Sequence, residues 1–110
     1  MATAYKVLGQ VAPSATTATT LYTCPSATEA VISTIVVANR STTNATYRIA
    51  VRPNGATLAN EHYIAYDVTV AASDSTTITL GITLDASDVV TVYASNANLS
   101  FNAFGSEITA

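Results

Sequence analysis

Side chains that could carry out chemistry are few in this sequence and lie far apart. The 110-residue chain contains one cysteine, Cys24, and one histidine, His62. A zinc site needs three or four Cys, His or carboxylate ligands, and a catalytic thiol needs a neighbouring base. A Ser-His-Asp site would have to use His62, and the residues around it do not resemble the turn that carries a nucleophilic serine. The sequence therefore predicts no enzyme, no metal site and no bound cofactor.

Two carboxylates, Asp85 and Asp88, are close enough in sequence to share a calcium ion, which binds several oxygen ligands within a short loop. The segment Asp85-Ala86-Ser87-Asp88 also has the composition of a tight turn, because Asp and Ser side chains hydrogen-bond to their own backbone. We expect a turn here. No glycine-rich phosphate loop is present, since the 4 glycines are scattered along the chain.

Four side chains are candidates for contact with another protein. Arg48 and Arg52 alternate with apolar residues, so both should lie on the solvent face of one strand. There they either stay solvated or bind an acidic neighbouring subunit through the planar guanidinium. Tyr63 should point to the opposite face from Ile64, where it could anchor an interface. Phe104 either packs beneath a second sheet or forms an exposed apolar contact.

Charge and composition exclude several functional classes. Only 10% of the residues are charged, and 4 Lys and Arg against 7 Asp and Glu give a formal net charge of −3. Nucleic-acid binding relies on many cations, so we expect no nucleic-acid partner. The sequence has no apolar run long enough to span a membrane, and a single cysteine forms no intramolecular disulfide. The first residues lack the charged and apolar regions of a signal peptide, so we expect synthesis in a cytosol.

The elements that must position these residues are strands, because apolar residues recur with a period of two. Two runs alternate in this way and should each bury one face: Ile78, Leu80, Ile82 and Leu84, and Ile64, Tyr66, Val68 and Val70. Residues 31–37 are apolar on both faces, which is typical of a central strand covered on both sides.

We therefore expect an all-β chain, residues 1–110 forming a single antiparallel β-sandwich domain of about eight strands, jelly-roll-like or immunoglobulin-like. The expected strands are residues 4–11, 19–24, 29–38, 45–52, 61–71, 75–83, 88–94 and 98–108. No segment reads as a helix. Residues 12–20 are low in complexity, so they form either a surface connection or, with the residues before them, an N-terminal arm (residues 1–20) that orders against a neighbour.

Several segments resemble a known group of viral proteins. They are Tyr5-Lys-Val-Leu-Gly-Gln10, Leu21-Tyr-Thr-Cys-Pro25, Ile35-Val-Val-Ala-Asn-Arg40, Ile49-Ala-Val-Arg-Pro53 and the closing run from Asp88 to Ile108. Together they resemble small β-sandwich virion structural proteins of tailed bacteriophages, notably those that infect cyanobacteria and other aquatic bacteria. These motifs are strand patterns and not catalytic signatures. Within such phages similar domains serve as capsid decoration (cement) proteins or as tail and fibre components.

The resemblance implies a non-enzymatic virion protein that is assembled in the host cytoplasm. The expected partners are the major capsid protein, which a cement protein binds to stabilise the particle, and further copies of the chain in a homo-oligomer such as a trimer. A tail, neck or fibre module, with or without host-surface binding, is the main alternative. A small secreted binding module is a third reading, and the absence of a signal peptide counts against it.

Overall fold

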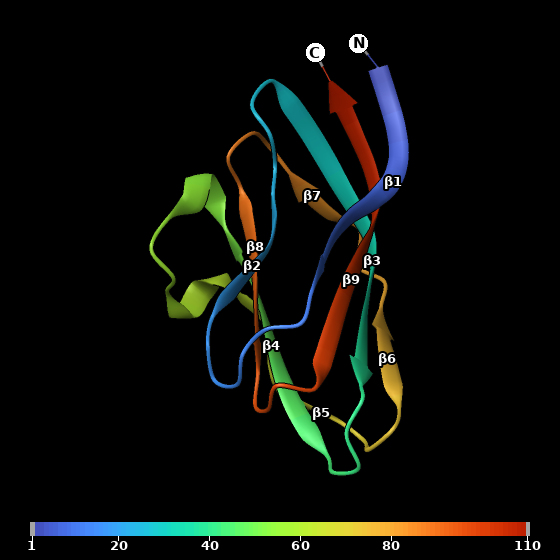
Figure 1. The fold of residues 1–110 in the computed structure, drawn as a ribbon. Helices are drawn as coiled ribbons and strands as arrows, with labels where there is room; N and C mark the ends of the chain where they lie inside the picture. Colours follow the sequence, from blue (N-terminus) through green and yellow to red (C-terminus); the bar gives the residue numbers. More distant parts are fainter. Residues whose placement is uncertain (1, 110) are drawn as a thin grey trace.

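The computed structural model describes residues 2–109, which form nine β-strands and two short 3-10 turns (Figure 1). This confirms the expected all-β sandwich. The strands are β1 (Ala2–Val11), β2 (Thr19–Thr23), β3 (Thr28–Asn39), β4 (Ala45–Arg52), β5 (Tyr63–Val70), β6 (Ser75–Ile78), β7 (Ile82–Leu84), β8 (Val89–Ala94) and β9 (Leu99–Thr109). The turns η1 (Pro53–Gly55) and η2 (Asn60–His62) lie between β4 and β5.

The strand order is that of a jelly roll. One sheet has the order β1-β9-β3-β6, with β7 also paired to β3, and the other has the order β2-β8-β4-β5. All pairs are antiparallel. The first four strands thus pair in reverse order with the last five, as if one long hairpin with its tip at residues 53–62 were wrapped into two layers. Of the two topologies expected, this order selects the jelly roll over the immunoglobulin sandwich.

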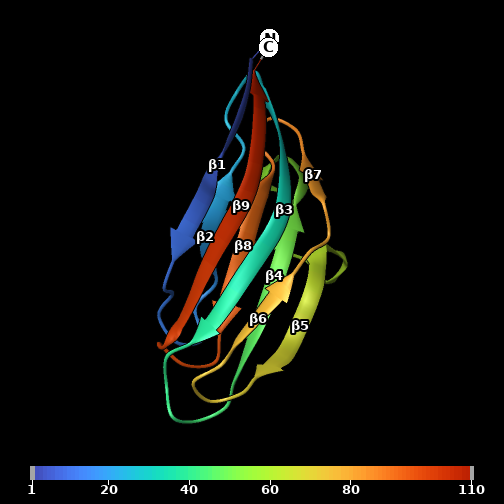
Figure 2. The ribbon, with the colours of Figure 1, turned by 90° about the vertical axis from the view of Figure 1, so that its right-hand side faces the viewer.

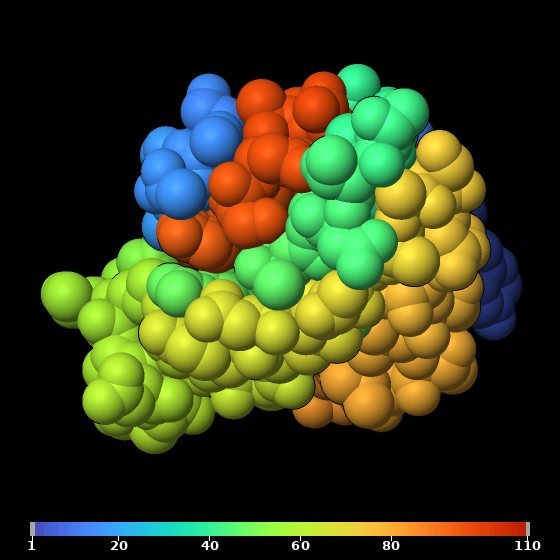
Figure 3. All heavy atoms as spheres, turned by 90° about the horizontal axis from the view of Figure 1, so that it is seen from below, coloured from blue at the N-terminus to red at the C-terminus, as the bar shows by residue number. Residues whose placement is uncertain are grey.

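The wrapping brings the two ends of the chain together. Ala2 is the strand partner of Thr109, and both termini lie at the upper end of the molecule (Figure 1). Viewed onto the face of the sheet β1-β9-β3-β6, β1 and β2 lie along one side of the sandwich, and β5, β6 and β7 lie along the other (Figure 2). The opposite end is covered by connecting loops (Figure 3). One of these loops, residues 12–18, is held to the end of β8 by a hydrogen bond of 2.8 Å from the Thr16 N–H to the Ala94 carbonyl.

The hydrophobic core lies between the two sheets and is built largely from alternate residues of the strands, although the buried set of β3 changes parity between Ile32 and Ile35. Phe101 in β9 is fully buried, and its ring meets Tyr47 in β4 edge-to-face, with ring centroids 6.2 Å apart. Aliphatic side chains from both sheets fill the space around this pair: Ile32, Ile35, Val37, Ile49, Val90, Val92 and Leu99. The alternation that the sequence displays is therefore the alternation between the core and the outer faces.

The prediction of one continuous strand over residues 75–83 is wrong, because the structure has two strands there. β6 ends at Ile78 and β7 begins at Ile82. Gly81, between them, has a φ of +65°, a backbone conformation that interrupts an extended strand. Leu80 is 58% exposed, although the alternation places it on the buried face with Leu84.

The expected strand at residues 61–71 begins two residues later than predicted and is kinked. Glu61 and His62 belong to η2, and β5 starts at Tyr63. Along β5 the register with β4 gains an extra residue, since Tyr47 faces Val68 and Ile49 faces Ala65. This β-bulge contains Asp67, which has a φ of 53°. Two residues expected in the core, Ile64 and Tyr66, are therefore exposed on the outer face.

The central strand β3 is covered on one face only, contrary to the expectation for residues 31–37. Ile32, Ile35 and Val37 are buried between the sheets. Val31 and Val36 are only half-buried. No second layer lies over the other face of β3 within residues 2–109, so the apolar character of the strand extends to an outer surface. Within the same residues no helix is long and apolar enough to cross a membrane.

Candidate interaction surfaces

The residues that could do chemistry are not brought together. Cys24 is buried, and its thiol donates a hydrogen bond of 3.3 Å to the Thr28 carbonyl. Burial raises the pKa of the Cys24 thiol above its usual value, which disfavours the reactive thiolate. His62 lies in η2, where its Nδ1 accepts a hydrogen bond of 3.0 Å from the Ala59 N–H. Among residues 2–109 no three His, Cys, Asp or Glu side chains form a cluster that could hold a metal ion.

The acidic segment 85–88 is a turn, as the sequence predicts. Asp88 accepts backbone hydrogen bonds with both carboxylate oxygens, from the Asn54 N–H at 2.8 Å and the Asp85 N–H at 2.9 Å. Asp85 in turn accepts a hydrogen bond of 2.8 Å from the Ala86 N–H. These oxygens fix the loop and the nearby turn η1.

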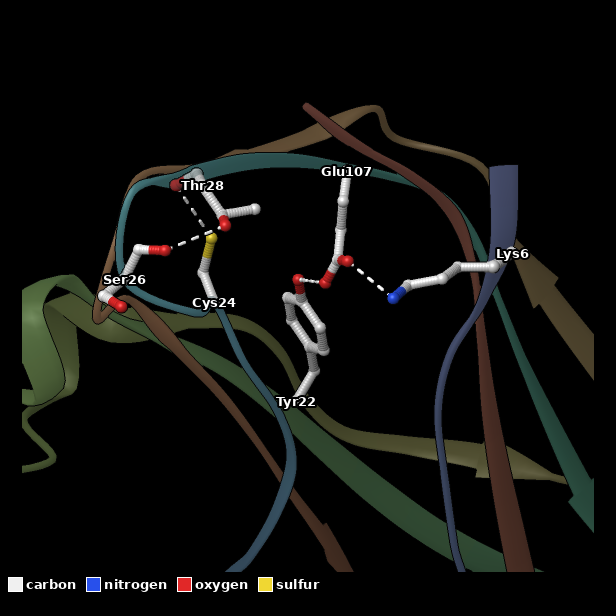
Figure 4. Close-up of polar contacts among 6 residues, drawn as sticks. All are labelled: Lys6, Tyr22, Cys24, Ser26, Thr28 and Glu107. Atoms are coloured by element: carbon white, nitrogen blue, oxygen red, sulfur yellow. Dashed lines mark hydrogen bonds and ion pairs between the residues drawn. The ribbon is translucent and has the colours of Figure 1, made fainter. Parts of the chain in front are cut away.

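A partly buried polar cluster joins the two sheets near the termini (Figure 4). Glu107 of β9 lies between Lys6 of β1 and Tyr22 of β2. The Lys6 Nζ is 2.6 Å from the Glu107 Oε1, and the Tyr22 hydroxyl donates a hydrogen bond to the Oε2. Tyr22 belongs to the opposite sheet from Lys6 and Glu107. The cluster therefore ties β1 to its own sheet and that sheet to the facing one.

The electrostatics of this cluster follow from burial and pairing. The hydrogen bond from Lys6, followed by that from Tyr22, lowers the pKa of the Glu107 carboxyl below its usual value. Burial, followed by the hydrogen bond to Glu107, raises the pKa of Tyr22 above its ordinary value. Glu107 is thus held as a carboxylate and Tyr22 as a neutral phenol. Both carboxylate oxygens of Glu107 are occupied within the chain, so the arrangement is suited to stabilising the sandwich and not to binding a substrate.

The outer face of the sheet β2-β8-β4-β5 carries an aromatic group around Arg48. The guanidinium lies 4.2 Å from the centroid of the Tyr66 ring and 4.2 Å from that of Tyr93. It also pairs with Asp67, with distances of 2.7 Å from the Nε to the Oδ1 and 3.3 Å from the Nη2 to the Oδ2. The hydrogen bond to Asp67 raises the pKa of Arg48. Arg48 lies on the outer face as expected, and the acidic partner found for it is in its own chain.

Arg52 and Tyr63 also make contacts within the chain. The Arg52 Nε donates to the Thr91 hydroxyl at 3.1 Å, and its Nη1 donates to the Ala56 carbonyl at 3.1 Å. Tyr63 is half-buried and meets Tyr66 edge-to-face, with ring centroids 4.9 Å apart. The expectation that Tyr63 faces away from Tyr66 is therefore wrong. Its cause is the two register irregularities of β5 against β4, one on each side of Ala65, which break the strict alternation on which the expectation rests.

The outer face of the other sheet carries an apolar groove beside β1. Phe104 is 38% exposed there, which decides between the two positions that the sequence left open. The groove has a volume of about 500 Å³ and is lined by Tyr5, Lys6, Val7, Val31, Ser33, Phe104, Gly105 and Ser106. Tyr5 is 87% exposed and Val7 is 48% exposed. The sequence analysis did not single out Tyr5. The signal that could have identified it is the alternation of Tyr5 with Val7 in the first expected strand, which places both side chains on one face.

A jelly-roll sandwich with an exposed apolar outer face and an aromatic cluster is thus the class that the fold defines. No known protein family matches the sequence, and no curated protein is significantly similar to it. Among solved structures, a chain from infectious bursal disease virus, strain Gx, is similar with a TM-score of 0.54 and 12% identity over 96% of this chain. A chain from strain Gt of that virus is similar with a TM-score of 0.51 and 10% identity, also over 96%. This chain spans 31% of the length of each. At these identities the likeness establishes the shared fold.

Proposed function

We propose that this chain is a non-enzymatic structural protein of a virus particle, and specifically a capsid decoration protein of a tailed bacteriophage. One observation carries the proposal: the jelly roll is similar in fold to a chain of a virus structure, with a TM-score of 0.54 over 96% of this chain. Jelly rolls recur in viral capsid domains. The phage assignment rests on the strand motifs in the sequence.

The side chains of the described residues support a role in assembly. The thiol is buried, the only histidine accepts a backbone hydrogen bond, and the carboxylates of residues 85–88 hold a turn. Large hydrophobic side chains are exposed on both sheets: Tyr5, Val7 and Phe104 on one, and Ile64 and Tyr66 on the other. Such patches are typical of protein contacts.

The proposed mechanism is stabilisation of a lattice by mass action. The protein would bind the major capsid protein after assembly, in the virion, and bury surface across the joints between subunits. A ligand that binds only the assembled state stabilises that state in proportion to its occupancy. Modest affinity per copy suffices because the contacts repeat over the lattice. No bound cofactor takes part.

The test is the copy number of the protein in purified particles from the source, measured by quantitative mass spectrometry against the major capsid protein. A ratio near one, or a simple fraction of it, is the expected result for a decoration protein on a symmetric lattice. Absence of the protein from particles would overturn the proposal. Particles that lack the protein should also lose heat resistance, and unchanged resistance would contradict the cementing role.

The aromatic group on the outer face of β4, β5 and β8 favours a second candidate, a tail or fibre module that contacts the host surface. Tyr66 is 56% exposed, and Tyr63 and Tyr93 lie on either side of the same cluster. Exposed tyrosines suit recognition of sugars or proteins, since each offers an apolar ring and a polar hydroxyl. A copy number of a few per cent of the major capsid protein, together with binding on a glycan array, would favour this candidate.

A further inference from the structure

The edge of the five-stranded sheet at β1 is the least protected edge of the molecule. An edge strand exposes unpaired N–H and C=O groups, and proteins guard such edges by keeping them short, kinked or charged. β6 and β7, at the other edge of the same sheet, have 4 and 3 residues. In the facing sheet β2 has 5 residues, and β5 is kinked at Asp67. β1 has 10 residues and contains no proline.

The free part of this edge is the segment from Ala2 to Leu8. At its end the register with β9 shifts between Val7 and Gly9, so Leu8 lies in the irregularity and regular pairing ends at Val7. Gly9 also approaches the facing sheet so closely that a Cβ there would lie 2.1 Å from the Leu21 carbonyl oxygen. The main-chain groups that Ala2–Leu8 direct away from β9 have no strand partner among residues 2–109. An extended strand of another molecule can form hydrogen bonds with these backbone N–H and C=O groups.

The side chains along this segment fit a second copy of the same chain. The groove beside β1 is lined by one charged residue, Lys6, and that charge is paired with Glu107. Two molecules with a net charge of −3 can therefore meet here through an uncharged surface. Tyr5 is 87% exposed, and a two-fold axis at Tyr5 pairs the regular residues Thr3–Val7 with the same residues of the partner.

We propose that two copies of this chain join through β1 in an antiparallel pair centred on Tyr5, which makes one continuous sheet across the dimer. In this register Tyr5 lies opposite the partner's Tyr5, and Val7 lies opposite the partner's Thr3. Each Tyr5 ring reaches the partner's Val7 diagonally, within the range of cross-strand contacts. The contact deepens the proposed function by naming a surface through which copies associate, and it predicts a dimer in place of the expected trimer.

The experiment measures the oligomeric state of the purified chain by sedimentation over a range of concentrations, with no particle present. The unaltered chain should form dimers. Tyr5→Lys should raise the dimer dissociation constant at least about tenfold, because it replaces an aromatic pair with two like charges. Leu80→Lys is the matched control, since Leu80 is 58% exposed near the opposite edge of the sheet, and it should leave the dimer unchanged. A monomer at every concentration, a trimer, or a dimer that is insensitive to Tyr5→Lys would overturn the proposal.

The register has its own test by disulfide formation. Residues directly opposite each other in antiparallel strands have Cα atoms about 4.5–5.5 Å apart, within the range of about 4.4–6.8 Å that a disulfide spans. Tyr5→Cys should therefore give covalent dimers on mild oxidation, and Val7→Cys should not. The native Cys24 is buried and does not compete. Cross-linking of the Val7→Cys variant and not of the Tyr5→Cys variant would refute the register. If β1 pairs instead with an arm of a different virion protein, the pure chain should form no dimers, which would overturn the proposal.

The outcomes for the dimer and for the proposed function are separable. A dimer in solution combined with absence from particles retains the β1 contact and rejects the virion role. A monomer in solution combined with a high copy number in particles rejects the β1 contact and retains the virion role.

Discussion

At the scale of single residues, Glu107 connects three strands that belong to the two sheets. It accepts from Lys6 and from Tyr22, which belong to different sheets. A folded-state pKa below the unfolded value means that this carboxylate stabilises the fold above its unfolded pKa of about 4.3. That stability is lost as the pH falls through the lower folded pKa.

Glu107→Gln should lower the free energy of unfolding at pH 7 by about 1–3 kcal/mol, because it removes the charge that Lys6 pairs with. Between about pH 5 and pH 3 the variant should lose less stability than the unaltered chain, since one titrating group is gone. Urea unfolding at several pH values measures both effects. Glu29→Gln is the control, because Glu29 is exposed on β3. Equal acid sensitivity in the Glu107→Gln variant and the unaltered chain would contradict this assignment.

The two phenylalanines offer a second test at this scale, since both lie in β9 and differ in burial. Phe101 is fully buried against Tyr47, and Phe104 is 38% exposed. Phe101→Ala should cost about 3–5 kcal/mol of unfolding free energy, because it leaves a cavity in the core. Phe104→Ala should cost less than about 1 kcal/mol. Thermal and urea unfolding of the two variants checks the difference, and a large loss from Phe104→Ala would mean that the outer face is packed.

At the scale of elements, the close approach of β9 to β3 depends on Gly105. A Cβ at this position would lie 1.9 Å from the Val31 carbonyl oxygen, which is backbone and cannot move aside cheaply. Gly105→Ala should therefore cost about 2–4 kcal/mol of unfolding free energy, because the two strands must separate locally. Gly81→Ala is the comparison. Its Cβ would meet nothing within 4 Å, but the φ of +65° should cost about 1–2 kcal/mol. Urea unfolding of both variants measures the difference, and a smaller loss at Gly105 than at Gly81 would contradict the argument.

The sequence predicts the elements well where alternation is uninterrupted and poorly where it is broken. The buried residues of β9 from Leu99 to Ala103 follow the period of two. In β3 the buried set changes parity between Ile32 and Ile35, at the register shift between Ile32 and Thr34. The bulge at Asp67 and the break at Gly81 reverse or end the alternation. Non-glycine residues with a positive φ, such as Asp67, have no reliable sequence signal. Strict alternation therefore places Ile64, Tyr66 and Leu80 in the core, although they are exposed.

For the candidate contact residues, the sequence could indicate the face of a strand on which a side chain lies, but not the residues that it meets there. The place of Arg48 on an outer face follows from strand parity, whereas the sequence left the place of Phe104 open. The neighbours of a side chain do not follow from parity, because Arg48 meets Tyr93 and Glu107 meets Tyr22 only after the chain has wrapped into two layers. Contacts between strands so far apart in sequence depend on the topology, which eight alternating runs leave open.

At the scale of the whole molecule, the wrapped hairpin makes a definite prediction about where the chain can be cut. Ala2 pairs with Thr109, so a short linker can join the native ends without distorting either sheet. The tip of the hairpin, residues 53–62, holds two short turns with no buried residue, and it protrudes from the sandwich (Figure 3). Such exposed connections tolerate new termini, because few packing contacts depend on them.

A circular permutant that begins at Thr57 and ends at Ala56, with the native ends joined by a linker of about four residues, should fold to the same sandwich. Its unfolding free energy should lie within about 1–2 kcal/mol of the unaltered chain, since all strand pairs are retained. Urea unfolding and circular dichroism provide the measurement. A permutant opened at Thr34, inside β3, is the control and should fail to fold, because β3 pairs with β9, β6 and β7. Failure of the first permutant together with folding of the second would contradict the strand order. In this order residues 53–62 connect β4 to β5 outside the core, whereas β3 pairs with three other strands.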